Sequence, residues 1–248
     1  MGYTHHWYRV AEFNKEDFIN VAADFKKLMP VFEALSIKLA NGNGKGRPKI
    51  SEEVINFNGL EACGHNKRNL GITWPADHAS GVAQIVVEGE PVTDASPLTT
   101  QLTGLFGGNL ATTVNTKARN ATGDSDVGGT WYAGTKLNQR TCGGDCSHET
   151  FYFPRIEEID KWKVEDYKKS GVFFCFTKTA YKPYDFAVNC ALIIADHYLR
   201  GKVFVHSDGE LEDWQDAIKI CQKALGYGSD FDFRDEPKEA EVGLIKND

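Results

Sequence analysis

The segment CGGDCSHETFYFPR, residues 142–155, combines several reactive side chains at close spacing. Cys142 and Cys146 are four positions apart, and His148 and Glu149 follow before an aromatic run. Such residues are typical of half a metal site, of an acid–base pair in an enzyme, or of a disulfide at a loop–strand junction. The choice between these alternatives decides whether the chain performs chemistry or builds a structure.

The six cysteines fall into two groups according to their sequence surroundings. One group lies within apolar strand and helix patterns, which predicts small buried side chains; its members are Cys175, Cys190 and Cys221. The other group lies in glycine-rich loops, which predicts exposed thiols; its members are Cys63, Cys142 and Cys146. One internal disulfide would use two of the three exposed thiols, so the third would be left to pair with another molecule. Plain thiols are the simpler alternative.

A zinc site is a further alternative for the same loops. Its ligands would be thiolates and imidazoles, which suit tetrahedral zinc: Cys63, His65, Cys142, Cys146 and His148. The spacings C-x-H and C-x3-C-x-H differ from the two-residue spacing of common zinc modules. We therefore predict no cofactor and no metal as the first interpretation.

An intracellular enzyme, perhaps a hydrolase, is the main alternative to a structural protein. Its acid–base residues would be His148 and Glu149, with His5 and Lys178 near the end of the sheet. Adjacent residues on a strand point to opposite faces, so His148 and Glu149 would act together only if the chain bends there. The sequence contains no nucleophile elbow, P-loop, dinucleotide-binding glycine motif or HExxH zinc motif.

Hydrophobic periodicity predicts the elements that position these residues. We expect strands over residues 2–10, 52–59, 149–155, 171–179 and 202–209. The strand over residues 171–179 is expected to be buried. We expect a helix capped by Asn14 and interrupted at Pro30, with a second piece to about Leu39. Further helices are predicted over residues 156–169, 184–200 and 210–226. This order predicts a single α+β domain over residues 1–248, with helices on one face of a mainly antiparallel sheet.

Residues from about 60 to 141 differ in character from the rest of the chain. Glycine, threonine, asparagine and alanine dominate there, and no lysine or arginine occurs between Arg68 and Lys117. We interpret this region as an insertion of short strands and long loops. Its small polar side chains would lose little conformational entropy in a contact between molecules.

Composition limits the partners and the location of the protein. The 248 residues are 41% hydrophobic, as in a globular chain, and the net charge of −7 argues against nucleic-acid binding. No apolar run reaches the roughly 18–20 residues of a membrane span, and we find no secretory signal pattern at the start. We therefore expect an intracellular protein that associates with itself, most readily near its pI of about 5.5.

Four blocks of the sequence resemble a known group of proteins: MGYTHHWYR, INFNG, SHETFYFPR and CFTKTAYKPYDFAV. They are similar to bacterial and phage proteins that open with Gly-Tyr-Thr-His-Tyr-Trp, although His6 replaces the tyrosine here. The insertion at about residues 60–141 is a second difference. The chain also resembles the OCTIN-like fungal proteins of that group. This resemblance implies disulfide-stabilised protein crystals in vacuoles, which serve gravity sensing, and it carries over no catalytic residue.

Overall fold

The computed structural model describes residues 3–35, 37–64, 73–74, 86–87, 90–91, 131–132, 135–138, 140–141, 144–158, 167 and 170–234. Cys142, His65 and most of the helix predicted over residues 156–169 lie outside these residues. The predictions for them remain predictions.

The first sheet joins strands from the two ends of the chain. Its members are β1 (Thr4–Arg9), β12 (Phe173–Lys178) and β13 (Val203–Ser207). The central strand β1 pairs antiparallel with both neighbours. Side chains along β1 alternate between buried and partly exposed, because successive residues of a strand point to opposite faces. His5 and Trp7 therefore face inward, whereas His6 and Tyr8 face outward.

The second sheet is built around β4 (Val54–Gly59). Its partners are β2 (Leu39–Ala40), β3 (Lys49–Ile50) and β11 (Phe151–Pro154), all antiparallel. Short antiparallel pairs also occur in the insertion: β5 (Thr73–Trp74) with β10 (Arg140–Thr141), β6 (Val86–Val87) with β7 (Glu90–Pro91), and β8 (Trp131–Tyr132) with β9 (Thr135–Lys136). The antiparallel pairing of the predicted sheet is confirmed.

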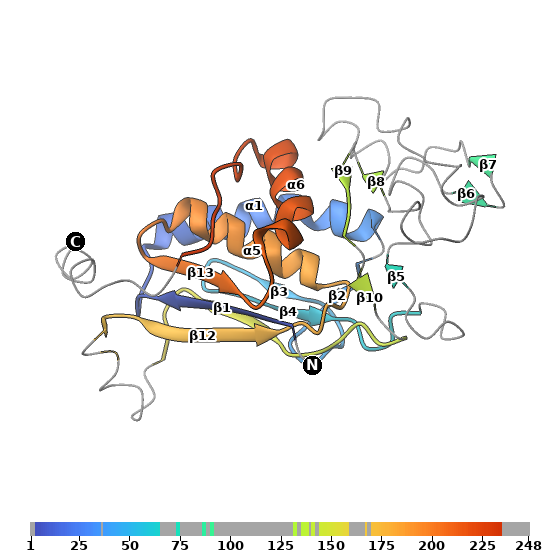
Figure 1. Ribbon diagram of the computed structural model, residues 1–248. Helices are drawn as coiled ribbons and strands as arrows, with labels where there is room; N and C mark the ends of the chain where they lie inside the picture. Colours follow the sequence, from blue (N-terminus) through green and yellow to red (C-terminus); the bar gives the residue numbers. More distant parts are fainter. Residues whose placement is uncertain are drawn as a thin grey trace.

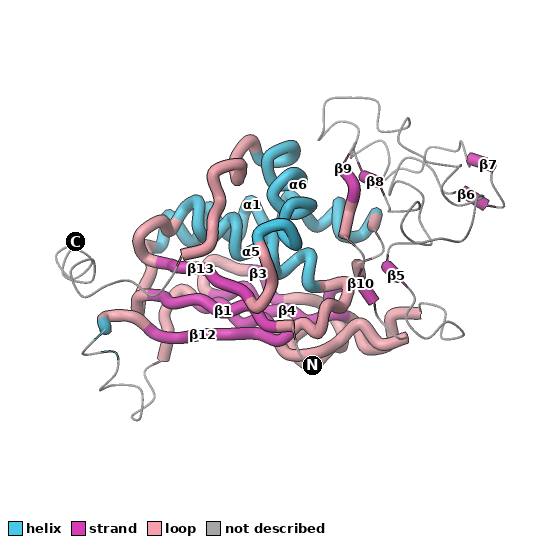
Figure 2. The backbone as a smooth tube through the Cα atoms, viewed as in Figure 1, coloured by secondary structure: helices cyan, strands magenta, loops and turns pink. Residues whose placement is uncertain are grey.

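The helices lie together on one face of the strands (Figure 1, Figure 2). They are α1 (Lys15–Ala34), α5 (Asp185–Tyr198), the 3-10 helix η3 (Leu211–Trp214) and α6 (Gln215–Leu225). The side chain of Asn14 accepts hydrogen bonds from the first-turn N–H groups of α1, as its position predicts. Gly226 ends α6 in the left-handed conformation, with φ of 87°. The fold class is α+β.

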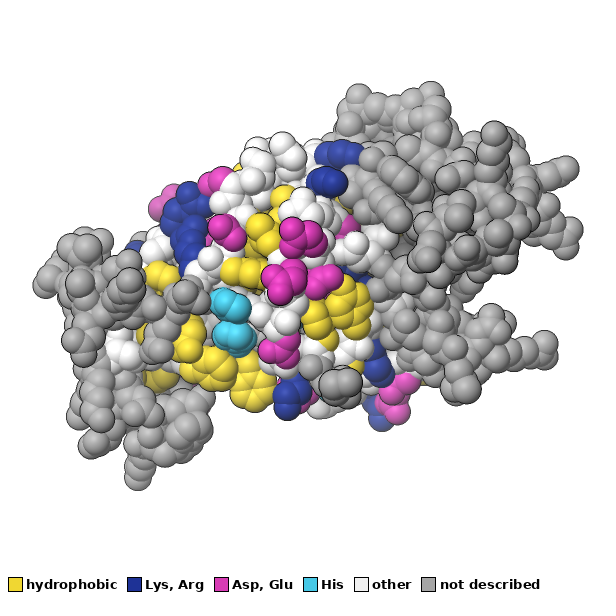
Figure 3. Space-filling view, in the orientation of Figure 1, with side chains coloured by type: hydrophobic (Ala, Val, Ile, Leu, Met, Phe, Trp, Pro, Cys, Tyr) yellow, Lys and Arg dark blue, Asp and Glu magenta, His cyan; other side chains and the backbone are white. Residues whose placement is uncertain are grey.

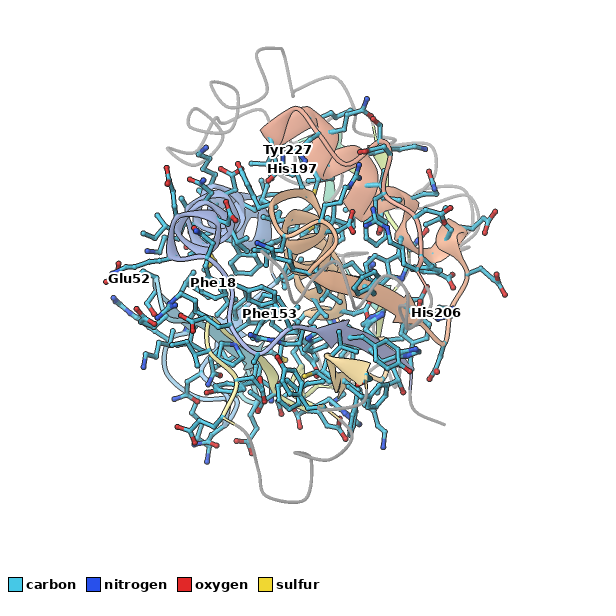
Figure 4. The ribbon with its side chains drawn as sticks, turned by 90° about the vertical axis from the view of Figure 1, so that its left-hand side faces the viewer. Phe18, Glu52, Phe153, His197, His206 and Tyr227 are labelled. Carbon is cyan, nitrogen blue, oxygen red and sulfur yellow. The ribbon has the colours of Figure 1, made fainter. Side chains whose placement is uncertain are left out.

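Aromatic side chains fill the space between the helices and the strands. Phe18 of α1 and Phe153 of β11 lie together there, with ring centroids 6.0 Å apart (Figure 4). Trp7 of β1 meets Phe151 of β11 at 5.4 Å, so the two sheets share one core. This core fixes the inward-facing residues of β1, including His5.

Two predictions about these elements are wrong. α1 continues through Pro30 to Ala34, although a proline inside a helix removes one hydrogen bond and costs about 3 kcal/mol or more. The helix continues because completely buried side chains on both sides of Pro30, among them Leu28 and Val31, hold it against the core. The strand over residues 171–179 is not buried on both faces, since the helices cover only its inner side.

Candidate functional site

The interior of the molecule holds a connected group of polar side chains around Asp185, the first residue of α5. His5 Nε2 lies 2.7 Å from Asp185 Oδ1, and His5 Nδ1 lies 2.9 Å from Ser207 Oγ. The exposed fractions of His5, Asp185 and Ser207 are 0%, 0% and 4%. Ser207, His5 and Asp185 therefore form a linear hydrogen-bonded series inside the protein.

Arg140 connects this series to a second carboxylate. Its Nε donates to Asp185 Oδ2 at 2.9 Å, and its Nη1 donates to Asp216 Oδ2 at 2.7 Å. The hydroxyl of Thr179 donates to Asp185 Oδ1 at 2.5 Å. We call these residues the interior polar cluster: His5, Arg140, Thr179, Asp185, Ser207 and Asp216. Arg140 lies at the end of the predicted insertion, in β10, so the cluster ties that end to α5 and α6.

The charges within the cluster keep Asp185 ionised. Burial alone would raise the pKa of the Asp185 carboxyl, but His5 and Arg140 more than offset this effect and lower the pKa to about 2. Burial would likewise lower the pKa of Arg140, whereas the carboxylates of Asp216 and Asp185 raise it above its ordinary value. The carboxylates and the guanidinium therefore hold one another in their charged forms.

The lowered pKa of Asp185 predicts a specific loss of stability in acid. An unfolded aspartate titrates at about 3.9, so the stabilisation is complete above that pH and is lost as the pH falls towards 2. We expect Asp185 to contribute about 2 kcal/mol to this loss. Urea unfolding of the wild type and of Asp185→Asn from pH 6 to pH 2 measures it. An equal pH dependence in the two proteins would contradict the assignment.

Tyrosines cover the end of the cluster that is nearest to solvent. The ring of Tyr3 meets the ring of His5 at 4.9 Å, and the hydroxyl of Tyr3 donates to Asp213 Oδ2 at 3.5 Å. Gly209 permits this position, because a Cβ at residue 209 would overlap the Tyr3 hydroxyl. Tyr181 packs against Tyr3 at 4.4 Å, and both Ala180 and Tyr181 adopt positive φ angles that are uncommon for these residue types.

The outer face of the first sheet carries a continuous group of aromatic rings, which we call the aromatic face: His6, Tyr8, Phe174, Phe176 and His206. His6 stacks on His206 at 5.0 Å and meets Phe174 at 5.6 Å. Phe174 also contacts Tyr8 at 5.4 Å and Phe176 at 5.9 Å. Phe174 is 48% exposed and Phe176 is 50% exposed. Figure 3 shows hydrophobic side chains beside two histidines on this part of the surface.

Comparisons with protein-family models, curated proteins and solved structures find no match for this chain. No described helix is long and apolar enough to cross a membrane. The features of the molecule that bear on its function are therefore the interior polar cluster, the aromatic face and the cysteines.

The predicted exposure of the loop thiols is wrong for two of them. Cys63 and Cys146 are 0% and 1% exposed and pack together as a small buried cluster apart from the main core. The two ends of the insertion meet there, because Gly59 has no Cβ that would overlap the carbonyl of Cys146. Cys63 forms no disulfide with any described residue. Cys142 lies outside the described residues, so its predicted disulfide remains a prediction.

The other cysteines mostly follow their patterns. Cys190 and Cys221 are completely buried, as predicted, and burial raises the pKa of the Cys190 thiol. Cys175 is only partly buried, because β12 lies at the side of its sheet. Within the described part of the chain, no group of three or more His, Cys, Asp or Glu side chains is placed to hold a metal ion. His65 and Cys142 are not among the residues to which that finding applies.

The predicted acid–base residues meet only in part. The chain bends at Glu149, and His148 and Glu149 both contact Lys178: His148 Nδ1 lies 2.9 Å from the Lys178 carbonyl, and the Lys178 N–H donates to Glu149 at 2.9 Å. His5 lies apart from them and contacts Asp185 and Ser207 instead. The contacts of His148 are thus with backbone, which ties β11 to β12.

The partners of His5 could not be predicted from the sequence. Asp185 is 180 positions away from His5, and Ser207 is 202 positions away. No local pattern connects residues at such separations. The sequence indicates only that one of the adjacent histidines of the first strand is buried. A buried histidine needs polar partners, but the sequence does not show which residues they are.

Proposed function

We propose that the protein is a self-assembling structural protein whose copies associate through the aromatic face. The observation that carries this proposal is the exposure of Phe174 and Phe176, at 48% and 50%, within a continuous group of rings. Single exposed apolar residues are ordinary, but a contiguous exposed group is typical of an interaction surface. The proposal keeps the self-assembly predicted from the sequence and places its contact on the sheet.

The strand edge beside these rings favours a second copy of the chain as the occupant. The backbone groups of Lys178 point away from β1, since both bind Glu149. Backbone direction alternates along a strand, so the N–H and C=O groups of Phe174 and Phe176 also point outward. Among the described residues, no strand pairs with this edge of β12. An antiparallel edge is complementary to its own copy across a two-fold axis, which makes β12 self-complementary.

The charges around the aromatic face agree with a neutral partner. The ammonium group of Lys178 lies 5.7 Å from the ring centre of Phe176. The negative charge of Asp208 lies near enough to His6 to raise the pKa of its imidazole, against the larger opposing effect of burial. The carboxylate of Glu149 lies 3.8 Å from the Lys178 ammonium group, so this lysine is paired and offers little attraction for a polyanion. The chain as a whole carries a charge of −7, so copies repel one another elsewhere and meet best at this nearly neutral face.

The area of the face indicates a weak contact. A phenylalanine that is half exposed offers about 100 Å², so the five rings offer about 300–400 Å² per copy. Stable complexes bury about 800 Å² per partner. A contact of this size holds only when it is repeated, as in a lattice of many copies. We extend the proposal to the properties that the resemblance implies: the copies form protein crystals in vacuoles, and these crystals serve gravity sensing. A disulfide from Cys142 would stabilise such crystals.

Sedimentation velocity of the full chain in a reducing buffer tests the proposal. We expect the weight-average sedimentation coefficient to rise with protein concentration, because the aromatic contact needs no disulfide. If it rises only without reductant, covalent pairing is responsible and the aromatic face is the wrong surface. If it stays constant up to millimolar concentration in both buffers, the protein does not assemble.

The histidine pair predicts that acid weakens the association. Burial and the nearby charge of His206 lower the pKa of His6, while Asp208 acts in the opposite direction. A second copy that covers His6 and His206 removes them from water, which favours the neutral form of the imidazole rings. Association should therefore fall as the pH drops below about 6.5. The approach of the net charge to zero near pH 5.5 opposes this trend. That long-range effect is screened beyond about 8 Å in physiological salt, so the local charge should dominate.

Sedimentation velocity at pH 8, 7, 6 and 5 measures this pH dependence. The matched variant is His6→Gln, which removes one titrating ring from the stacked pair. We expect a smaller decrease with acid in the variant than in the wild type. Association that becomes stronger at pH 5.5 in both proteins would show that net charge controls it instead.

A further inference from the structure

We propose that Ser207, His5 and Asp185 form a nucleophilic site for small neutral carboxylic esters, closed by the ring of Tyr3. This activity is independent of self-assembly. It rests on the two hydrogen bonds, 2.9 Å and 2.7 Å, that join a serine hydroxyl to an imidazole and the imidazole to a carboxylate. The same three groups in the same connected order activate the serine of many hydrolases.

The hydrogen bonds fix the proton positions that such a site needs. The carboxylate of Asp185 only accepts hydrogen bonds, so the Nε2 of His5 carries a proton and donates it to Oδ1. In the neutral ring, Nδ1 is then an acceptor and faces the hydroxyl of Ser207 at 2.9 Å. Thr179 and Arg140 also donate to Asp185, which holds the carboxylate in place. The imidazole is thereby oriented as a base towards Ser207.

Tyr3 occupies the approach to Ser207. Its ring meets the ring of His5 at 4.9 Å, and its hydroxyl lies 3.5 Å from Asp213 Oδ2 and against Gly209, whose N–H donates to Ser207 Oγ. The backbone of Tyr3 is held by the N–H of Thr179 at 2.8 Å, and its side chain is only partly buried. The proposal therefore includes a rotation of the Tyr3 ring about its χ1 bond, which would open a path to the serine.

The proposed reaction is an ordinary acyl transfer. Ser207 Oγ bonds to the carbonyl carbon of the ester while its proton moves to His5 Nδ1. The bond to the alcohol then breaks, and the leaving oxygen takes the proton from His5. Water hydrolyses the acyl-serine by the same steps and restores both groups. The N–H of Gly209, 3.2 Å from Ser207 Oγ, is the nearest backbone donor to the reacting atoms.

The surroundings of the site set the class of substrate. Asp213 lies beside the site and accepts hydrogen bonds from the hydroxyls of both Tyr3 and Tyr181. This carboxylate disfavours anionic acyl groups. The rings of Trp214 and Tyr3 each meet the ring of His5 at 4.9 Å, so the groups around the imidazole are aromatic. These features favour a small uncharged acyl group.

A fluorophosphonate probe tests the proposal on the full chain. The probe bonds to an activated serine with loss of fluoride, and mass spectrometry of the intact protein and its peptides locates the adduct. We expect slow labelling of the wild type at Ser207, at least tenfold faster labelling of Tyr3→Ala, and no labelling of Ser207→Ala. Tyr152→Ala, which removes a 51% exposed tyrosine from β11, is the matched control and should label like the wild type.

A folded Tyr3→Ala variant that stays unlabelled would overturn the proposal, as would an adduct that persists in Ser207→Ala. If Tyr3→Ala does not fold, prolonged exposure of the wild type decides the question. An adduct at Ser207 then supports the site, and its absence rejects it. Sedimentation of the same samples is expected to be unchanged, which keeps this test separate from the test of self-assembly.

Discussion

Arg140→Met is expected to lower the free energy of unfolding by about 3–5 kcal/mol at pH 7, the range measured when one partner of a buried ion pair is removed. Methionine has a similar length but carries no charge. The variant therefore leaves the carboxylates of Asp185 and Asp216 buried beside each other without their shared cation. Both carboxylates have side-chain exposures of 1% or less, so water cannot replace the guanidinium. Urea unfolding monitored by circular dichroism measures the loss.

The pH dependence of this loss distinguishes charge from packing. Without Arg140, burial and mutual repulsion raise the pKa of one carboxyl in the folded state above its unfolded value. The folded variant then binds an extra proton, so its stability increases as the pH falls from 7 towards 5. The difference from the wild type should therefore shrink over that interval. A difference that stays constant would attribute the loss to packing alone.

Arg155→Met is the matched control for Arg140→Met. Arg155 also joins two carboxylates, Glu12 at 2.8 Å and Glu53 at 3.0 Å. The side chains of both glutamates are more than half exposed, so solvent can take over from the arginine. We expect little change in the unfolding midpoint. Equal losses from the two variants would contradict a special role for the interior polar cluster.

The double substitution Phe174→Ser and Phe176→Ser is expected to weaken self-association at least tenfold. It removes the two most exposed rings of the aromatic face, which carry most of its apolar area. The stability of the monomer should change little, because both side chains are about half exposed and β1 still pairs with β12 through its backbone. Sedimentation velocity over a concentration series measures the association, and thermal unfolding checks the monomer.

Ile19→Ser is the control for this double variant. Ile19 is 39% exposed on α1, on the helical side of the molecule. The substitution removes exposed apolar area of a similar kind away from the aromatic face. We expect it to sediment like the wild type. If Ile19→Ser weakens the association as much as the double variant, general surface hydrophobicity rather than the aromatic face is responsible.

Local patterns predicted the elements but not their surroundings. The alternation in residues 2–10 is the pattern of β1, and Gly226 marks the end of α6. The apolar run GVFFCFTKT, in which phenylalanines enclose Cys175, predicts a buried strand. Its outward-facing rings, Phe174 and Phe176, are exposed, since the helices pack only on the inner side. Which face of a strand is covered depends on the packing of distant elements.

The candidate sites depend even more on contacts between distant residues. The glycines around Cys63 and Cys146 predict exposed loops. Their burial results from the close approach of the two ends of the insertion at Gly59. His5 was recognised as a reactive residue, but its partner Asp185 comes from the other end of the chain. Only the folded register of β1 against β13 and α5 brings these groups together.

Hydrogen–deuterium exchange at low and high protein concentration tests the central claim most directly. The outward-pointing amides of Phe174 and Phe176 should exchange quickly in the monomer, because no strand among the described residues pairs with this edge of β12. We predict that peptides covering residues 172–178 become protected as the concentration rises, in reducing buffer, while peptides from α1 do not change. Protection that is independent of concentration, or that rises only on α1 or near the cysteines, would contradict assembly through the aromatic face.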